Sequence, residues 1–229
     1  MNILAIDTST KNYSLAISSD DQILAQVNLH LPDVLEDSVI PGIERLLFLS
    51  KLTLAQVDGF VAGLGPGSFT SLRVGISTVK ALAWSTGRPI VGISSLDAIA
   101  ANAEVEEAGQ IAVLCDARRN MVFGCLYQKT RNELKALTDY LLVPPQKILE
   151  RIHSDTFFTG NGISLFAPMM AQAAKKQGWK ASFAPEHQWL PNARTFISLS
   201  LPKFLNQELT AASDLLPLYL YPEDCQVTQ

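Results

Sequence analysis

The sequence predicts an α/β protein built from two similar lobes, and three observations support this fold class. Short apolar runs end in an aspartate at two places, residues 4–7 and residues 113–116. Each run continues through a short polar turn into a second apolar run, which is typical of two paired strands. In both halves, segments with helical spacing of apolar residues then alternate with further short apolar runs. This repetition indicates a duplicated unit.

The first half predicts five strands and three helices. Polar residues 19–22 lie between two apolar runs and predict a hairpin. Leu35, Val39 and Ile43 recur at helical spacing, and Pro41 inside that pattern should kink or split the helix. The expected strands cover residues 2–6, 13–18, 23–29, 57–62 and 89–93, and the expected helices cover residues 34–50, 68–85 and 95–104.

The second half predicts the same order of elements. The expected strands cover residues 111–115, 121–128, 134–143 and 156–159; helices cover 144–151, 165–177 and 193–206, with a loop at 183–191 and irregular chain after 215. We therefore expect two lobes, residues 1–106 and 107–229. Each resembles a ribonuclease H-like βββαβα unit, and their duplication is the architecture of the actin–Hsp70–sugar-kinase (ASKHA) group.

Composition and charge exclude several classes of function. The chain of 229 residues has a net charge of −4 at pH 7, and its basic residues form no stripe. Nucleic-acid binding needs clustered Lys and Arg, so we expect any nucleic acid to be held by a partner. Three cysteines without paired spacing predict no disulfide framework. Without a signal peptide or an apolar run of membrane-spanning length, we expect a cytoplasmic protein with no membrane contact.

The turn formed by Asp7, Thr8 and Ser9 is the first candidate site. In the actin-like group this turn faces the phosphates of a nucleotide, and its Asp lies near the metal. The other interpretation is a hydrogen-bonded turn that joins two strands. Phosphate loops of this class usually contain a glycine, and none occurs between Asp7 and Lys11. The turn by itself therefore favours the structural interpretation.

The glycine-rich segment that precedes the second helix is the most informative stretch of the chain. Its glycines allow a tight strand-to-helix turn, and the amide groups at the helix start could hold an anion. It is not a Walker loop, because no Lys follows the glycines at the required place. The composition of the segment supports two interpretations about equally: a strand-to-helix turn with an unusual backbone, and an anion site. The segment consists of Gly65, Pro66, Gly67, Ser68, Phe69 and Thr70.

Small residues form a stripe along the helix that follows this segment. Ser71, Gly75 and Thr78 are spaced i, i+4 and i+7, beside a separate apolar stripe. One stripe must pack on the sheet, and the other suits a second helix lying close, within the chain or from a partner. The intramolecular case is the default. Together with the surplus apolar residues of the first helix, the stripe gives the hypothesis of a partner or dimer interface at Leu35, Val39, Ile43, Ser71, Gly75 and Thr78.

Asp116, Arg118 and Arg119 lie in the turn between two strands of the second lobe. The spacing favours a polar hairpin with solvated arginines. The alternative is that one arginine reaches a phosphate or a partner carboxylate. The three histidines are isolated and form no pair that could seat a metal, so we expect no metal site and no catalytic residue.

Three segments together resemble the TsaB family, which is also called YeaZ. They are residues 3–10, residues 65–75, which contain Gly-Pro-Gly-Ser-Phe-Thr, and residues 116–119. The Gly-Pro-Gly-Ser-Phe-Thr segment is the specific one, and residues 217–220 are similar to the C-terminal end of the family. The first half matches well, whereas beyond about residue 134 the match is mostly length and element order.

The resemblance implies a bacterial cytoplasmic protein needed for N6-threonylcarbamoyladenosine at position 37 of tRNAs that read ANN codons. It implies a non-catalytic subunit that binds and activates a catalytic paralogue, TsaD, through the helices of the first lobe. The ATPase TsaE would join that complex, and a homodimer would form on an overlapping surface when the chain is alone. The tRNA would be reached only through the complex. No cofactor would be bound strongly, although ATP or ADP could lie at the complex interface.

The chain departs from the family pattern at two places, and two other functions stay open. Typical members carry His-Ser-Glu where residues 35–37 here are Leu-Glu-Asp, and a glycine where this chain has Ser71. Both changes fall on the expected interface. The first alternative is an ATP-dependent phosphotransferase of the actin-like group, for which only Asp7 and Asp116 are available. The second is a metallopeptidase, which no histidine pair supports.

Overall fold

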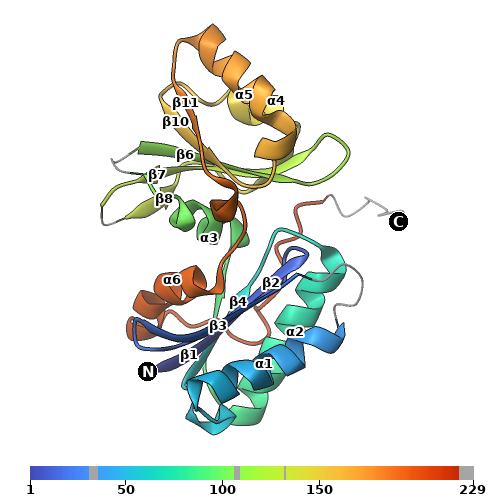
Figure 1. Ribbon diagram of the computed structural model, residues 1–229, viewed down its shortest axis with the longest axis vertical. Helices are drawn as coiled ribbons and strands as arrows, with labels where there is room; N and C mark the ends of the chain where they lie inside the picture. The colour runs from blue at the N-terminus through green and yellow to red at the C-terminus, as the bar shows by residue number, and fades with distance from the viewer. Residues whose placement is uncertain (31–35, 106–108, 132, 222–229) are drawn as a thin grey trace. The chain divides into compact units, whose positions relative to one another are not determined.

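The computed structural model describes residues 1–30, 36–105, 109–131 and 133–221 (Figure 1). These residues form two compact units. The first comprises the described residues within Met1–Ala98 and Pro191–Leu218, and the second comprises those within Ile99–Leu190 together with residues 219–221. Leu35, one of the expected interface residues, lies outside the described residues.

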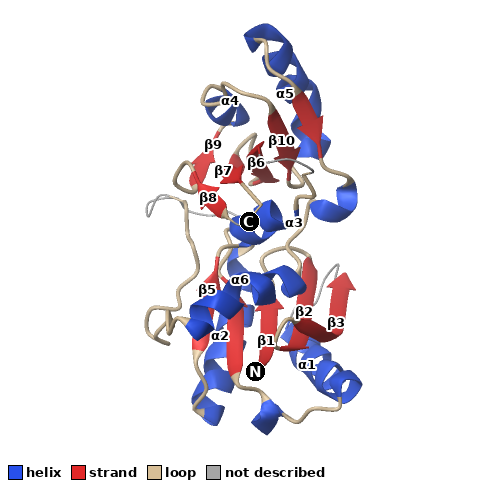
Figure 2. Cartoon of the chain, turned by 90° about the vertical axis from the view of Figure 1, so that its left-hand side faces the viewer, coloured by secondary structure: helices blue, strands red, loops and turns tan. Residues whose placement is uncertain are grey.

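The first unit is built on a five-stranded sheet in the order β3-β2-β1-β4-β5. Figure 2 shows strands of this sheet side by side. β1 and β2 pair antiparallel, as do β2 and β3, whereas β1, β4 and β5 are parallel. The strands are β1 (Asn2–Asp7), β2 (Asn12–Ser19), β3 (Gln22–His30), β4 (Gly59–Gly63) and β5 (Ile90–Ile93).

Helices cover both faces of this sheet (Figure 1). Because side chains of a strand alternate between its faces, Leu4 and Ile6 of β1 pack under α1 and α2, whereas Ile3 and Ala5 pack under α6. Burial on both faces explains why β1 and β4 are continuous apolar runs. The helices of the first unit are α1 (Glu36–Ser50), the 3-10 turn η1 (Leu54–Gln56), α2 (Phe69–Thr86) and α6 (Ala193–Leu205), and α3 (Ser95–Asn102) begins in this unit.

The second unit repeats the topology of the first. β6 pairs antiparallel with β7 and parallel with β10, which is parallel to β11, in the order β11-β10-β6-β7-β8. Read from β8, this is the order of the first sheet, so the duplicated fold is confirmed. The elements are β6 (Gly109–Asp116), β7 (Val122–Lys129), β8 (Leu134–Ala136), β9 (Leu141–Val143), α4 (Pro145–Leu149), β10 (Thr156–Thr159), α5 (Ile163–Gln177), β11 (Ala181–Phe183) and η2 (Glu186–Gln188).

The structure differs from the sequence-based expectations at four elements. α1 is not split at Pro41, which lies inside one helix; a kink there stays a prediction. The single strand expected over residues 134–143 is two short strands, β8 and β9, which both pair with β7. β11 was not expected, and it overlaps the expected loop only at Phe183. α6, expected in the second lobe, packs on the first sheet through Phe196 and Ile197, so the first unit is discontinuous in sequence.

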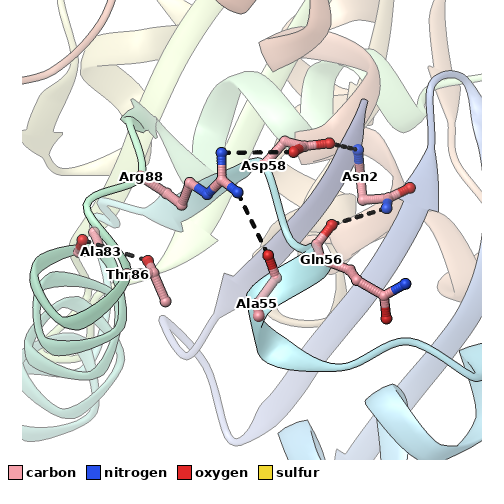
Figure 3. A network of polar contacts seen from close by, with 7 residues as sticks. All are labelled: Asn2, Ala55, Gln56, Asp58, Ala83, Thr86 and Arg88. Atoms are coloured by element: carbon pink, nitrogen blue, oxygen red, sulfur yellow. Dashed lines mark hydrogen bonds and ion pairs between the residues drawn. The ribbon is translucent and has the colours of Figure 1, made fainter.

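Polar contacts fix the far end of α2 to the start of β4 (Figure 3). The backbone N–H of Asn2 donates to Asp58 over 2.8 Å, and its side-chain amide donates to the carbonyl oxygen of Gln56 over 2.8 Å. Arg88, just after α2, donates to the carbonyl oxygen of Ala55 over 3.4 Å and lies 3.8 Å from Asp58. Arg88 and Asp58 are partly exposed, so this ion pair adds little stability and mainly orients the corner.

Candidate functional site

The carboxylate of Asp7 is the centre of a buried hydrogen-bond network at the end of β1. Ser95 Oγ donates to its Oδ1 over 2.8 Å, and Ser9 Oγ donates to its Oδ2 over 2.9 Å. Burial raises the pKa of Asp7 from 3.8 to about 6, and the hydrogen bonds from Ser95 and Ser9 lower it only in part. The first candidate turn is therefore an internal structure, with all of Asp7, Thr8 and Ser9 buried.

The glycine-rich segment packs directly on this network. Ser95 donates its backbone N–H to the carbonyl oxygen of Gly65 over 2.7 Å, and its hydroxyl accepts from the N–H of Gly65 over 3.2 Å. Gly65 has a φ of 86°, which explains the glycine, and its bond to Pro66 is cis. The structure thus brings two of the sequence-predicted segments together.

The start of α2 is held by the same turn. The backbone N–H of Ser68, the residue before the helix, donates to the carbonyl oxygen of Ser9 over 2.9 Å. Thr8 Oγ1 donates to the carbonyl oxygen of Ser71 over 2.6 Å. Ser68 makes no side-chain cap of its own, and its hydroxyl accepts instead from Ser71 Oγ over 2.8 Å. The amide of Ser68, a candidate anion donor, is therefore used within the chain.

Each residue of the turn faces one glycine. A Cβ at residue 63 would meet the carboxylate of Asp7, one at residue 75 would meet Thr8 Oγ1, and one at residue 67 would meet the carbonyl oxygen of Ser9. These contacts are too close for any side chain, so the sequence needs glycine at all three positions. The glycines serve close packing of the turn, β4 and α2.

The residues expected to form a partner interface are mostly buried in their own unit. Val39 and Ile43 are 1% and 4% exposed in the core beneath α1, and Ser71 is 2% exposed against Thr8. Gly75 is also buried, and Thr78 is half-buried with its hydroxyl bonded to its own helix. Val39, Ile43, Ser71 and Gly75 thus pack within their own unit, which is the intramolecular case of the sequence-based hypothesis. Helical spacing identified real stripes, but these are the stripes that face inward.

Large apolar side chains are exposed on the other side of the same two helices, which pack against each other on one face of the sheet. Phe48 is 81% exposed and Trp84 is 88% exposed. Arg73 lies 3.8 Å above the ring of Phe69. The sequence signal that could have found this surface is the i, i+8 spacing of Ile40 and Phe48. We call this surface the helix face; it comprises Ile40, Phe48 and Leu49 of α1 and Phe69 and Trp84 of α2.

The candidates of the second unit form a tight hairpin. Asp116 ends β6, as Asp7 ends β1, and its Oδ1 accepts from the N–H of Arg118 over 2.8 Å. Arg118, Arg119 and Asn120 all have positive φ, between 52° and 66°, which is uncommon for residues with side chains. The side chain of Arg118 is largely exposed, 3.9 Å from Asp116, whereas Arg119 lines a surface pocket with Phe166.

Within the described part of the chain, no group of three or more His, Cys, Asp or Glu side chains is arranged to hold a metal ion. None of its helices is both long enough and apolar enough to cross a membrane.

Comparison with known proteins gives the family. The model of the TsaD family, tRNA N6-adenosine threonylcarbamoyltransferase, matches residues 35–223. The protein named tRNA threonylcarbamoyladenosine biosynthesis protein TsaB from Bacillus subtilis is 29% identical over 223 residues, which cover 96% of this chain and 94% of that protein. The structure of YeaZ from Pseudomonas aeruginosa superposes with a TM-score of 0.81 at 28% identity, covering 96% of this chain and 99% of that one. The chain belongs to the TsaB (YeaZ) family, within the group that the TsaD model describes.

Other relatives agree with membership of the TsaB family. The Escherichia coli protein of the same name is 33% identical over 133 residues, 58% of this chain and 57% of that protein. An ROK hexokinase from Thermus thermophilus has a TM-score of 0.52 at 12% identity, over 88% of this chain and 100% of that one. The hexokinase shares the fold alone. The expected family and the expected ASKHA fold class are thus both confirmed.

Proposed function

We propose that this chain is a non-catalytic cytoplasmic subunit required for N6-threonylcarbamoyladenosine modification of tRNA. It binds the catalytic subunit of the TsaD type and activates it. Two findings support the proposal: the chain belongs to a family whose curated members are named for this biosynthesis, and the TsaD family model matches most of its length.

The helix face is the observation that carries the proposal. Phe48 and Trp84 leave most of their apolar surface in water, and burying one such side chain contributes about 1.5–3 kcal/mol. Aromatic residues and Arg are the side chains that most often dominate protein–protein binding, and Arg73 stacks on Phe69 at this surface. Two adjacent helices with exposed aromatic residues suit a helical partner that packs across them.

The rest of the assembly follows from the same proposal. The ATPase of the TsaE type joins the complex, ATP or ADP binds at the complex interface, and the tRNA is held by the partners. A second copy of this chain covers the helix face when the catalytic subunit is absent. The net charge of −4 supports a chain that does not grip tRNA by itself.

Formation of threonylcarbamoyladenosine in vitro tests the proposal. The reaction contains unmodified tRNA, the TsaD-type and TsaE-type subunits of the same organism, the adenylate-forming enzyme, ATP, threonine and bicarbonate. Modified adenosine is measured by mass spectrometry with and without this chain. We expect product only when the chain is present, and none from the chain with tRNA and substrates alone. An unchanged yield in its absence, or product from the chain alone, would overturn the proposal.

A further inference from the structure

The turn at the end of β1 contacts α2 at its first turn and at the turn that follows. Thr8 Oγ1 bonds the carbonyl oxygen of Ser71, and the carbonyl oxygen of Ser9 accepts from Ser68. Thr8 also lies against the backbone of Gly75, where a Cβ would overlap its hydroxyl. Through these contacts the turn sets how near α2 lies to the end of the sheet.

The carboxylate of Asp7 also holds this turn in place. It accepts from Ser9 and from Ser95, and Ser95 is bonded through its backbone to Gly65 in the loop that leads into α2. The start of the helix is thus fixed from both sides by buried hydrogen bonds. Such bonds are costly to leave unmade, so the arrangement admits little variation.

The buried and exposed sides of this part of α2 are coupled by the helix itself. Ser71 and Gly75 face Thr8, whereas Phe69 and Arg73, two residues away in each case, are exposed on the opposite side. An α-helix is rigid over two turns. A change in the contact with Thr8 therefore moves Phe69, which belongs to the helix face, and Arg73, which stacks on it.

We propose that Thr8 is a positioning residue for partner binding: through Ser71 and Gly75 it sets the orientation of α2 and so of the helix face. The turn of residues 7–9, which in the actin-like group faces a phosphate, here positions a docking surface. This inference rests on the proposed function, because it assigns Thr8 to the surface that binds the TsaD-type subunit.

The test compares Thr8→Val with Thr8→Ser in the full chain. Valine keeps the shape of threonine and removes the hydroxyl, whereas serine keeps the hydroxyl. Affinity for the TsaD-type subunit is measured by titration calorimetry, well below the unfolding temperature of each variant. We expect Thr8→Val to weaken binding by about three- to thirty-fold, and Thr8→Ser to stay within about twofold of wild type. Hydrogen exchange at residues 71–76 should be faster in Thr8→Val.

A second pair and a control separate positioning from general stability. Gly75→Ala should weaken binding, and adding Thr8→Ala should restore part of it, because the collision at Thr8 is relieved. Phe196→Leu loosens α6 on the opposite face of the sheet and should leave the affinity unchanged. If Thr8→Val and Gly75→Ala bind as tightly as wild type, or no more weakly than Phe196→Leu, the positioning role is overturned. If wild type itself does not bind, the proposed function fails instead.

Discussion

Ser95 Oγ donates a 2.8 Å hydrogen bond to Oδ1 of Asp7, joining the start of α3 to the end of β1 inside the first unit. This bond belongs to a carboxyl group whose pKa is raised to about 6 by burial. Because the pKa of this carboxyl group differs between the folded and the unfolded chain, the stability of the fold depends on pH.

Asp7→Asn should remove this pH dependence. The folded state holds the Asp7 proton more tightly than the unfolded chain, so the stability from this group is complete below pH 3.8 and is lost as pH rises through 6. The full difference corresponds to about 3 kcal/mol. Relative to wild type, Asp7→Asn should therefore gain free energy of unfolding between pH 4 and pH 7, measured by urea unfolding. A difference between the two proteins that is constant with pH would show that Asp7 is not titrating in this range.

Glutamate on the helix face should weaken partner binding strongly without unfolding the chain. Phe48→Glu or Trp84→Glu places a charge where an apolar contact is expected, and each should weaken binding to the TsaD-type subunit by about thirtyfold or more. The matched control is Leu205→Glu, at a leucine that is 76% exposed at the end of α6. Its affinity should stay within about twofold of wild type. Equal losses in all three variants would mean that the helix face has no special role.

Ile43→Ala should act on stability rather than on binding. Ile43 is buried in the core under α1, so its truncation should lower the free energy of unfolding by about 2–4 kcal/mol. Calorimetry at a temperature where the variant is folded should give the wild-type affinity. A stable variant with weakened binding would restore Ile43 to the docking surface.

Gly67→Ala should destabilise the chain more than Gly87→Ala. A Cβ at residue 67 would run into the backbone of Ser9, and forcing extra volume into a packed site costs about 1–3 kcal/mol. Gly87 follows α2 with a φ of 65° and has nothing within 4 Å of an added Cβ, so alanine there costs about 1 kcal/mol from strain alone. Thermal unfolding of both variants compares their stabilities. A lower stability of Gly87→Ala than of Gly67→Ala would contradict the close packing of the turn.

The sequence was sufficient for elements whose boundaries have strong local signals. Residues 156–159 form β10 as predicted. The end of this strand has a clear signal, because Gly160 follows it directly and has a φ of 101°. The helix expected over residues 68–85 is α2 (Phe69–Thr86), which ends where Gly87 takes the left-handed conformation. β11 was missed because its three residues carry too little pattern to separate a strand from a loop.

The candidate site was predicted in its parts and not in its arrangement. Asp7, the glycine-rich segment and Ser71 were all identified, and the structure brings them together. The role of Ser95 was missed, because nothing in the order of the chain shows that it lies beside Asp7. The helix face could not be predicted, because a sequence does not show which apolar side chains of α1 and α2 stay exposed; Phe48 and Trp84 are exposed.

Periodicity, glycine positions and the Gly-Pro-Gly-Ser-Phe-Thr segment are local properties of the chain, and they were enough to predict the duplicated fold, the family and the order of most elements. Which face of α1 and α2 is covered could be learned only from the packing of the folded chain. Helical spacing shows that two stripes exist, but the stripe that turns inward depends on what fills the space beneath it. Here that space is filled by Thr8, which is far from Gly75 along the chain and in contact with it in the fold.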